Sequence, residues 1–244
     1  MSHATPPPFP RDDRLDALRG LAMVWMTVFH FSFDLQHYGF FRADFYGDPF
    51  WTWQRSCIVS LFLLCAGMGQ AVALAQGQGW PRFWRRWGQV AGCALLVSLG
   101  SWFMFPRSFI SFGVLHGMAL MLILLRWGLP RLGQGALLGL ALGCLLLPVF
   151  VQHPFFDTRW TNWVGLVTHK PVTEDYVPVL PWLGLMLAGA VLARWLLPRL
   201  GAARPSGPLR RGLALLGRWS LSYYMVHQPV LIGGLMLWQA TMRG

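Results

Sequence analysis

Long apolar runs with few or no charged residues recur along this chain and constrain its fold more than any other feature. Of its 244 residues, 55% are hydrophobic and only 12% are charged. An ordinary soluble domain carries roughly 25% charged residues, so the composition is that of a membrane protein. Because lipid offers no hydrogen-bond partners, backbone groups in such runs must pair within each segment, as in a helix. The sequence therefore predicts an all-α, polytopic transmembrane helical bundle.

The lengths of these runs give the number of spans. A span needs about 20 apolar residues, which predicts about seven transmembrane helices. They occupy residues 15–35, 55–75, 84–104, 109–127, 132–151, 178–198 and 215–239. Residues 1–13 are rich in proline and charge and have no apolar core or cleavage site, so we expect a disordered tail rather than a signal peptide. The remaining residues, 14–244, would form one membrane domain.

The distribution of arginine sets the expected orientation. The net charge is +11, but the basic residues lie mostly between alternate spans, which argues against a nucleic-acid-binding protein. One side would carry the following residues: Arg11, Arg14, Arg19, Arg82, Arg85, Arg86, Arg126, Arg131 and the stretch from Arg194 to Arg218. By the positive-inside rule this side, and the N-terminus with it, faces the cytoplasm.

Two sets of small residues are interpreted as packing features. The four cysteines lie in predicted spans without paired spacing, so we expect neither disulfides nor a metal site. They are Cys57, Cys65, Cys93 and Cys144. Gly135, Gly139 and Gly143 recur at four-residue intervals in the fifth predicted span. Such a stripe predicts a close helix–helix contact.

A polar stripe in the first span is the strongest functional signal. Arg19 and His30 are eleven residues apart, close to three helical turns, so both face the same way about 16 Å apart. Asp16 precedes Arg19 by about one turn, and Asp34 follows His30 by about one turn. Ionisable groups at membrane depth are costly, and they mark a site or pathway that faces the bundle interior.

His30 and Asp34 have the spacing of a general base and its orienting carboxylate. At i and i+4, the Asp34 carboxylate is within reach of one imidazole nitrogen, which would fix the tautomer of His30. The other nitrogen could then accept a proton from a substrate. The alternative is structural: a backbone carbonyl satisfies His30, and Asp34 is solvated at the membrane interface.

Two further histidines are predicted at similar depth. His116 lies in the fourth span, and His227 lies in the last span with Tyr223 four residues before it. Pro229 loosens that last helix, as in helices that line a cavity. Three histidines on three spans predict one shared site, in which His116, His227 or Tyr223 would stabilise an oxyanion. Alternatively, each side chain fills its own packing gap.

Arginines at the cytoplasmic side form a second candidate site. Arg82 and Arg85 stand at the start of the third span, and Arg19 lies at the inner end of the first. Guanidinium groups bind phosphate in bidentate fashion, so these residues are candidate ligands of a phosphorylated cofactor. Arginines in this position also serve membrane orientation alone.

Several motifs carry a family resemblance. The R-x10-H pattern within LDALRGLAMVWMTVFH resembles the signature of the transmembrane acyltransferase superfamily, which includes the acyltransferase-3 and heparan-alpha-glucosaminide N-acetyltransferase families. Four further stretches are similar to bacterial relatives of the latter family: SLFLLCAGMG, SFGVLHGMAL, VPVLPWLG and LGRWSLSYYMVHQPVL. They occur in the same order and cover most of the chain.

The resemblance implies an activity and an assignment of residues. Such proteins move an acetyl or other acyl group from cytoplasmic acetyl-CoA to a hydroxyl or amine of an extracytoplasmic sugar, without a metal. His30 corresponds to the catalytic histidine, Arg19 to the motif arginine, and Arg82 and Arg85 to an R-x-x-R sequence. In the lysosomal member the proposed active histidine follows the first span, which leaves His37 as a rival to His30.

The resemblance also implies the cellular setting. Its bacterial members indicate a multi-pass protein of the bacterial inner membrane, with the lipid bilayer, acyl-CoA and a glycan as partners. Because about seven spans are fewer than in these families, we expect the cavity either to be smaller or to be completed by a second copy. The acceptor, the acyl length, O- versus N-acylation and a covalent acyl-histidine intermediate stay open.

Two other functions fit parts of the pattern. His30, His116 and His227 could supply two axial ligands to a b-type haem, although the paired histidines and quinone site of such proteins are missing. Asp34 and His30 could instead form the relay of a proton-coupled transporter. That class predicts internal repeats and broken helices, which the sequence lacks.

Overall fold

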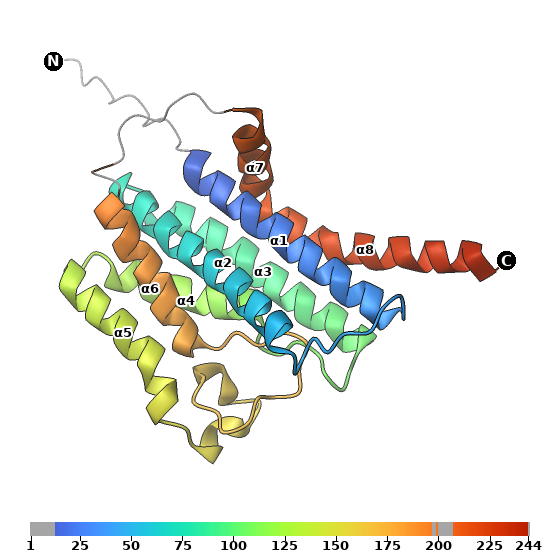
Figure 1. Cartoon of the computed structure of the whole chain (residues 1–244). Helices are drawn as coiled ribbons and strands as arrows, with labels where there is room; N and C mark the ends of the chain where they lie inside the picture. The colour runs from blue at the N-terminus through green and yellow to red at the C-terminus, as the bar shows by residue number, and fades with distance from the viewer. Residues whose placement is uncertain (1–12, 197–198, 200–206, 244) are drawn as a thin grey trace.

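The computed structural model describes residues 13–196, 199 and 207–243, and the regular elements in these ranges are helices joined by loops (Figure 1). The α-helices are α1 (Asp13–His37), α2 (Pro49–Ala75), α3 (Trp80–Met104), α4 (Val114–Gly128), α5 (Gln134–Phe150), α6 (Val179–Leu196), α7 (Pro208–Arg218) and α8 (Ser220–Arg243). Two short 3₁₀ helices, η1 (Pro154–Asp157) and η2 (Asn162–Val164), lie between α5 and α6. The all-α class is confirmed. All of the predicted tail except Asp13 lies outside the described residues.

A helix occupies each predicted span, with one division. The segment 215–239 is split at Trp219 into the end of α7 and most of α8. Of the described helices, α2, α3 and α6 are long and apolar enough to cross a membrane, whereas α4 and α5 are apolar but shorter. Charged residues in the first two turns of α1 lower its hydropathy. Three candidate spans are therefore established by length and composition, against about seven in the sequence-based prediction.

The helices run up and down, so alternate loops gather at the two ends of the bundle. The proximal end holds the start of α1, the turn from α2 to α3, and the end of α4 (Figure 1). The distal end holds the end of α1 and the long segment from α5 to α6 that contains η1 and η2. The main helix contacts join α2 to α6, α5 to α6, and α1 to α7 and α2.

Glycines allow the closest of these contacts. A Cβ atom on Gly67 of α2 would lie 1.8 Å from the backbone oxygen of Met186 in α6. The reverse contact is equally tight, because a Cβ on Gly189 would lie 2.2 Å from the Leu64 oxygen. Helix axes that approach this closely leave no room for a side chain, so α2 and α6 are in near backbone contact.

The predicted glycine contact on α5 is wrong. No atom of the described residues lies within 4 Å of a Cβ built on Gly135, Gly139 or Gly143. Helix α5 turns a different face inward, where Ala141 packs against Gly184 of α6. The glycine stripe shares the outward face with exposed leucines such as Leu142. Regular spacing defines a face of a helix, but it does not determine which face meets a neighbour.

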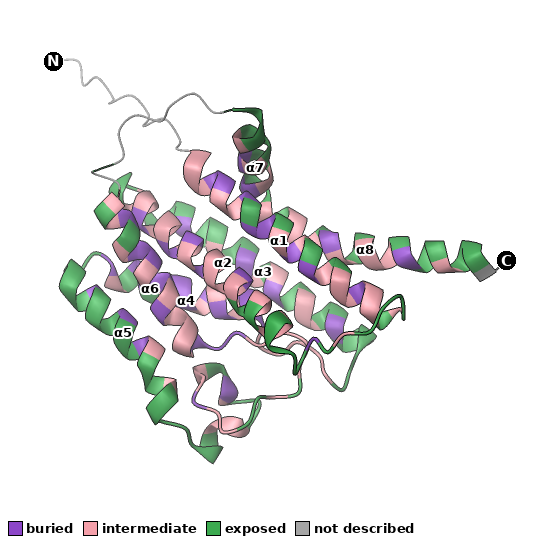
Figure 2. Ribbon diagram, viewed as in Figure 1, coloured by how far each residue is buried: buried purple, intermediate pink, exposed green. Residues whose placement is uncertain are grey.

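Burial follows the pattern of a membrane protein. Buried residues lie between the helices, while the outer side of α5 and the far part of α8 are exposed (Figure 2). Much of this exposed surface is apolar, including Val149, Phe150 and Leu237. A soluble monomer rarely exposes a continuous apolar surface of this kind, and lipid would cover it without cost. The four cysteines are free and are buried or half-buried, as predicted.

Candidate active site

Two histidines from α1 and α8 meet inside the bundle. His30 Nδ1 lies 2.8 Å from His227 Nε2, within hydrogen-bond distance. The two rings stack with their centroids 5.0 Å apart and their planes 15° from parallel. His227 is buried and His30 is half-buried. Residues nearly two hundred positions apart in the sequence are thus directly paired.

The hydrogen bonds around this histidine pair fix the positions of its protons. His227 Nδ1 lies 2.7 Å from the backbone oxygen of Tyr224, which can only accept a hydrogen bond. His227 Nδ1 therefore carries the proton, and in the neutral ring Nε2 is an acceptor. It follows that His30 donates from Nδ1 and that its Nε2 keeps a lone pair. This lone pair is the proton acceptor that a general base requires.

Tyr223 holds the histidine pair from one side. Its ring stacks on His227 with centroids 5.9 Å apart and an interplanar angle of 11°. Its hydroxyl lies 2.7 Å from Thr27 Oγ1, which itself donates to the backbone oxygen of Met23. Tyr223 is therefore the donor in the bond to Thr27. The predicted proximity of Tyr223 and His227 is confirmed, but the hydroxyl of Tyr223 is engaged on α1.

The predicted hydrogen bond from His30 to Asp34 is wrong. Asp34 is buried, and its Oδ1 accepts a bond of 2.8 Å from Gln228 Nε2 on α8. Its Oδ2 has no partner among the described residues. The two residues are one turn apart on α1, as the sequence indicated. Each bonds to α8 instead, His30 to His227 and Asp34 to Gln228. The sequence analysis did not identify Gln228 as a site residue. The signal that could have found it is an amide side chain between His227 and Pro229 in an otherwise apolar helix.

His116 does not join the histidine pair, contrary to the predicted three-histidine site. Its Nε2 lies 3.0 Å from Ser98 Oγ, and that hydroxyl donates to the Ile110 oxygen at 2.6 Å. Ser98 thus accepts from His116 Nε2–H. The other nitrogen, Nδ1, accepts from the Gly113 amide at 3.3 Å, at the start of α4. Both nitrogens are used locally, so His116 ties α4 to α3 as a structural residue.

We expect the His116→Ala variant to be less stable but fully active per folded molecule. The change leaves the Gly113 amide without its acceptor and the Ser98 oxygen without the His116 donor, which costs about 1–3 kcal/mol. Thermal unfolding in detergent measures the loss, and the turnover number of the folded fraction measures the activity. A stable variant with reduced turnover would instead return His116 to the active site.

The arginine candidates lie in different surroundings at the proximal end. Arg19 Nη1 lies 3.0 Å from Asp16 Oδ1, and its Nη2 lies 3.4 Å from the Cys65 oxygen of α2. Asp16 also pairs with Arg218 of α7, at 3.5 Å. Arg82 and Arg85 are exposed near the start of α3. Arg19 thus links α1 to α2, and its partner Asp16 extends the link to α7, whereas Arg82 and Arg85 are accessible to a ligand.

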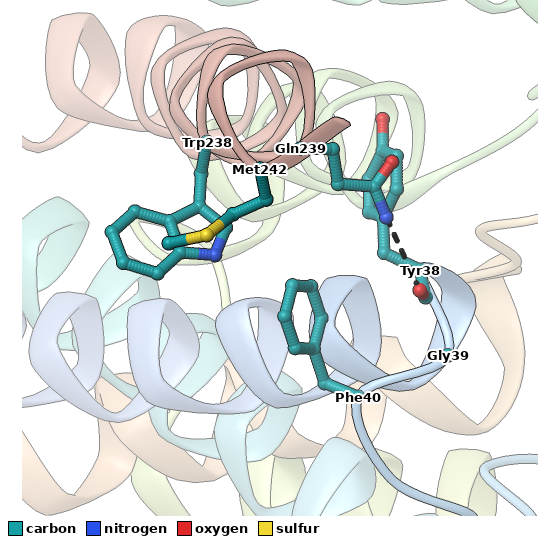
Figure 3. A pocket seen from close by; sticks show the side chains of 6 residues that line it. All are labelled: Tyr38, Gly39, Phe40, Trp238, Gln239 and Met242. Atoms are coloured by element: carbon teal, nitrogen blue, oxygen red, sulfur yellow. Dashed lines mark hydrogen bonds between the residues drawn. The ribbon is translucent and has the colours of Figure 1, made fainter. Parts of the chain in front are cut away.

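The rival histidine, His37, lies in the last turn of α1. It is exposed, and its ring contacts Tyr38 edge-on with centroids 5.5 Å apart. Nearby, a small pocket lies between the end of α1 and the end of α8 (Figure 3). Its lining residues are Tyr38, Gly39, Phe40, Trp238, Gln239 and Met242. None of these is an acid or a histidine, so the histidine pair has the stronger catalytic chemistry.

The distal loops are fixed by carboxylates. Glu174 accepts hydrogen bonds from Ser108 at 2.6 Å and from the Tyr46 hydroxyl at 2.9 Å. Burial, together with the bond to Glu174, raises the pKa of Tyr46 to about 12. Asp175 accepts from the Val114 amide at 2.6 Å, and burial raises the pKa of its carboxyl. These bonds hold the segment before α6 over the distal end.

No group of three or more acidic, histidine or cysteine side chains in the described ranges could hold a metal ion. The sequence matches the family model described as "Heparan-alpha-glucosaminide N-acetyltransferase, catalytic" over residues 11–229. This range includes both histidines of the pair and all three predicted arginine ligands. No curated protein and no solved structure matches the chain.

Proposed function

Because the chain belongs to the heparan-alpha-glucosaminide N-acetyltransferase catalytic family and is thus a membrane acetyltransferase, we propose that acetyl-CoA is its donor and a sugar its acceptor. The donor would bind from the cytoplasm, and the hydroxyl or amine of the acceptor would lie on the other side of a bacterial inner membrane. This assignment places the N-terminus and the proximal end in the cytoplasm, in keeping with the arginines there. We further propose that the remaining helices complete about seven spans.

The proton pattern of the histidine pair is the observation that carries this proposal. His30 is oriented by His227, and His227 is oriented by the Tyr224 carbonyl. His30 is then the base, His227 the group that orients it, and the Tyr224 carbonyl the fixed acceptor that holds His227. A general base needs a chain of contacts of this kind. In this proposal His227 takes the orienting role that the sequence suggested for Asp34.

The reaction proceeds by proton transfer at His30. Its Nε2 removes the proton from the acceptor O–H or N–H as that atom attacks the thioester carbonyl. The new C–O or C–N bond forms, the C–S bond breaks, and the proton on His30 passes to the departing thiolate to give free CoA. His227 Nε2 stabilises the transient imidazolium by accepting the Nδ1–H bond. Because the Tyr223 hydroxyl and both His116 nitrogens are engaged, neither residue stabilises the oxyanion.

The length of the donor suits the distance between the two candidate sites. Arg19 and His30 lie eleven residues apart on α1. This separation is about 16 Å, a distance that an extended pantetheine arm spans between the helices. Arg82 and Arg85 are exposed cations that could contact the phosphates.

The two alternatives are less well supported. In a haem site the two axial nitrogens face the iron from opposite sides. Here the nearest nitrogens of His30 and His227 face each other at 2.8 Å, which leaves no space for iron between them. A transporter would require broken helices at membrane depth; α1 has no helix-breaking residue near Asp34 and His30, although Pro229 follows their partners in α8.

A pair of substitutions at His227 tests the proposal. We expect His227→Ala to reduce the turnover number by about tenfold or more, because His30 loses its orienting bond. His227→Gln should recover part of the activity, since a glutamine oxygen can accept the His30 Nδ1–H bond. The measurement is acceptor-dependent release of CoA from acetyl-CoA by purified protein. Equal turnover in the wild type and both variants would exclude His227 from orienting the base.

A further inference from the structure

Two buried acceptor oxygens without a hydrogen-bond donor lie next to the histidine pair. Asp34 is only 3% exposed, and its Oδ1 accepts from Gln228 Nε2. Neither Asp34 Oδ2 nor Gln228 Oε1 has a partner among the residues that the structure describes. Each of these oxygens shares a carbon atom with one end of the Asp34–Gln228 bond, so the two oxygens lie close together. Buried polar atoms are nearly always paired, and an unpaired one is costly, so these two call for a ligand.

The chemistry of the two oxygens defines the ligand group that fits them. An ionised carboxylate and an amide oxygen can only accept hydrogen bonds. The ligand must therefore donate, which suits an O–H or N–H group and excludes phosphate, sulfate and carboxylate groups. His37, one turn further along α1, interacts electrostatically with Asp34 but does not donate to its free oxygen.

The free oxygens lie one helical turn from the proposed base. Asp34 follows His30 by four residues on α1, and Gln228 directly follows His227 on α8. The His30–His227 and Asp34–Gln228 bonds thus join the same two helices at successive turns of α1. Residues at i and i+4 have Cβ atoms roughly 5–6 Å apart. A molecule whose reacting atom meets His30 can therefore reach Asp34 with a substituent on the neighbouring carbon.

The direction along α1 assigns these oxygens to the acceptor rather than to the donor. Arg19 lies eleven residues before His30, towards the proximal end, whereas Asp34 lies beyond His30, towards the distal end. Under the proposed function, acetyl-CoA comes from the proximal end and the sugar from the distal end. Asp34 is then on the sugar's side of the base. A sugar carries hydroxyl groups on neighbouring carbons, which are the donors that the free oxygens lack.

Helix α8 can bend directly after Gln228. Pro229 has no backbone N–H to donate to the carbonyl four residues earlier, which loosens the helix at this point. Further along, a Cβ on Gly233 or Gly234 would meet no atom of the described residues within 4 Å. A local movement of α8 away from α1 would therefore open the space beside Asp34 Oδ2 to a ligand.

We propose that Asp34 and Gln228 form the acceptor subsite of the transferase. Asp34 Oδ2 and Gln228 Oε1 accept hydrogen bonds from the sugar hydroxyls next to the atom that is acetylated, and so place that atom at His30 Nε2. The subsite selects a sugar with a free hydroxyl beside the reacting O–H or N–H. Both residues position the acceptor and transfer no proton. This inference rests on the proposed function, because it assumes a sugar acceptor.

Steady-state kinetics with sugars that lack one hydroxyl test the subsite. The probes are methyl glucoside, methyl galactoside, methyl mannoside and glucosamine, each beside its monodeoxy analogues, with acetyl-CoA as donor. Release of CoA gives the rate, and NMR of the product gives the acetylated position. In wild-type protein, loss of the hydroxyl next to that position should lower kcat/KM by about tenfold or more, because a hydrogen bond to a carboxylate is lost. Loss of a hydroxyl across the ring should have a smaller effect.

The Asp34→Asn variant separates contact with the sugar from a structural role. Asparagine keeps an oxygen that can accept from Gln228, but it replaces the free acceptor with an NH₂ donor. We expect the KM for the sugar to rise about tenfold or more and the KM for acetyl-CoA to stay unchanged. The parent sugar and its deoxy analogue should then differ by less than about twofold, because the contact that distinguishes them is gone.

A second variant and a matched control come from glutamines of α8. Gln228→Met removes the other free oxygen and should also raise the KM for the sugar without changing the KM for acetyl-CoA. The control is Gln239→Met, which removes another α8 amide that bonds to α1, at the Tyr38 oxygen. This control should leave both KM values unchanged.

The outcomes separate the subsite from the proposed function. An unchanged sugar KM in Asp34→Asn and Gln228→Met would overturn the subsite, as would an equal rise in the KM of sugar and donor, which indicates general damage. If Asp34→Asn does not fold, Gln228→Met and the wild-type analogue series decide. If wild-type protein acetylates none of these sugars, the proposed acceptor is wrong and the subsite falls with it. If it acetylates a sugar but discriminates against no deoxy analogue, only the subsite is wrong.

Discussion

The His30→Ala variant is expected to lose acetyl transfer by a factor of about 10² to 10⁴, the usual contribution of a general base. The free lone pair of the histidine pair is on His30 Nε2. His227 Nε2 loses its donor in this variant, but it is aimed at the place of His30 Nδ1 and not at that of His30 Nε2, so it does not take over the role. Release of CoA from acetyl-CoA, measured with a panel of sugar acceptors, reports the loss. CoA binding by the same variant should be unchanged.

The matched control is His37→Ala. His37 is exposed at the end of α1, where its ring contacts Tyr38, so its removal should leave turnover within about twofold of wild type. The two variants together decide between the rival bases. If His37→Ala is inactive while His30→Ala still turns over, the catalytic histidine lies in the loop region, and the His30–His227 contact is structural.

The second large effect is expected on stability, from Gly67→Ala. The new Cβ would lie 1.8 Å from the Met186 oxygen and 2.8 Å from its carbonyl carbon, so α2 and α6 must separate. Overpacking costs typically 1–3 kcal/mol, and a clash against backbone belongs at or above the upper end of this range. The midpoint of thermal unfolding in detergent measures the change.

Gly139→Ala is the control for this substitution. It makes the same chemical change in a helix, but no atom of the described residues lies within 4 Å of the new Cβ. Because alanine is favoured over glycine in a helix by about 1 kcal/mol, this variant should be as stable as wild type or more stable. Comparable destabilisation by both substitutions would restore the predicted glycine contact on α5, whereas an unchanged unfolding midpoint for Gly67→Ala would contradict the α2–α6 contact.

Local sequence patterns predicted the helices well and their partners poorly. The length of each apolar run correctly predicted a helix in each span, because backbone hydrogen bonds within a helix join only neighbouring residues. The division at Trp219 was missed, since α7 and α8 together have the length of one span. The glycine stripe of α5 was assigned to a contact that the structure does not make, because an outward face and an inward face can have the same spacing.

The candidate site shows the same limit at the level of single side chains. His30, His227 and Tyr223 were predicted to be together, and the structure confirms this. The partner of His30 was predicted to be Asp34, four residues along the same helix, and it is instead His227 on α8. His116 is also a histidine in an apolar helix, so the sequence could not distinguish it from His30 and His227. Its nitrogens bond to Ser98 and Gly113 instead.

The sequence by itself determined the all-helical class, the membrane environment, the approximate helix bounds and the short set of ionisable residues among which the site had to lie. These depend on composition and on interactions within a few residues. Only the tertiary structure decided which candidates pair and which already have hydrogen-bond partners. Hydrogen bonding of a side chain depends on what the neighbouring helix presents, and helix rotation and crossing are set by packing across the whole bundle.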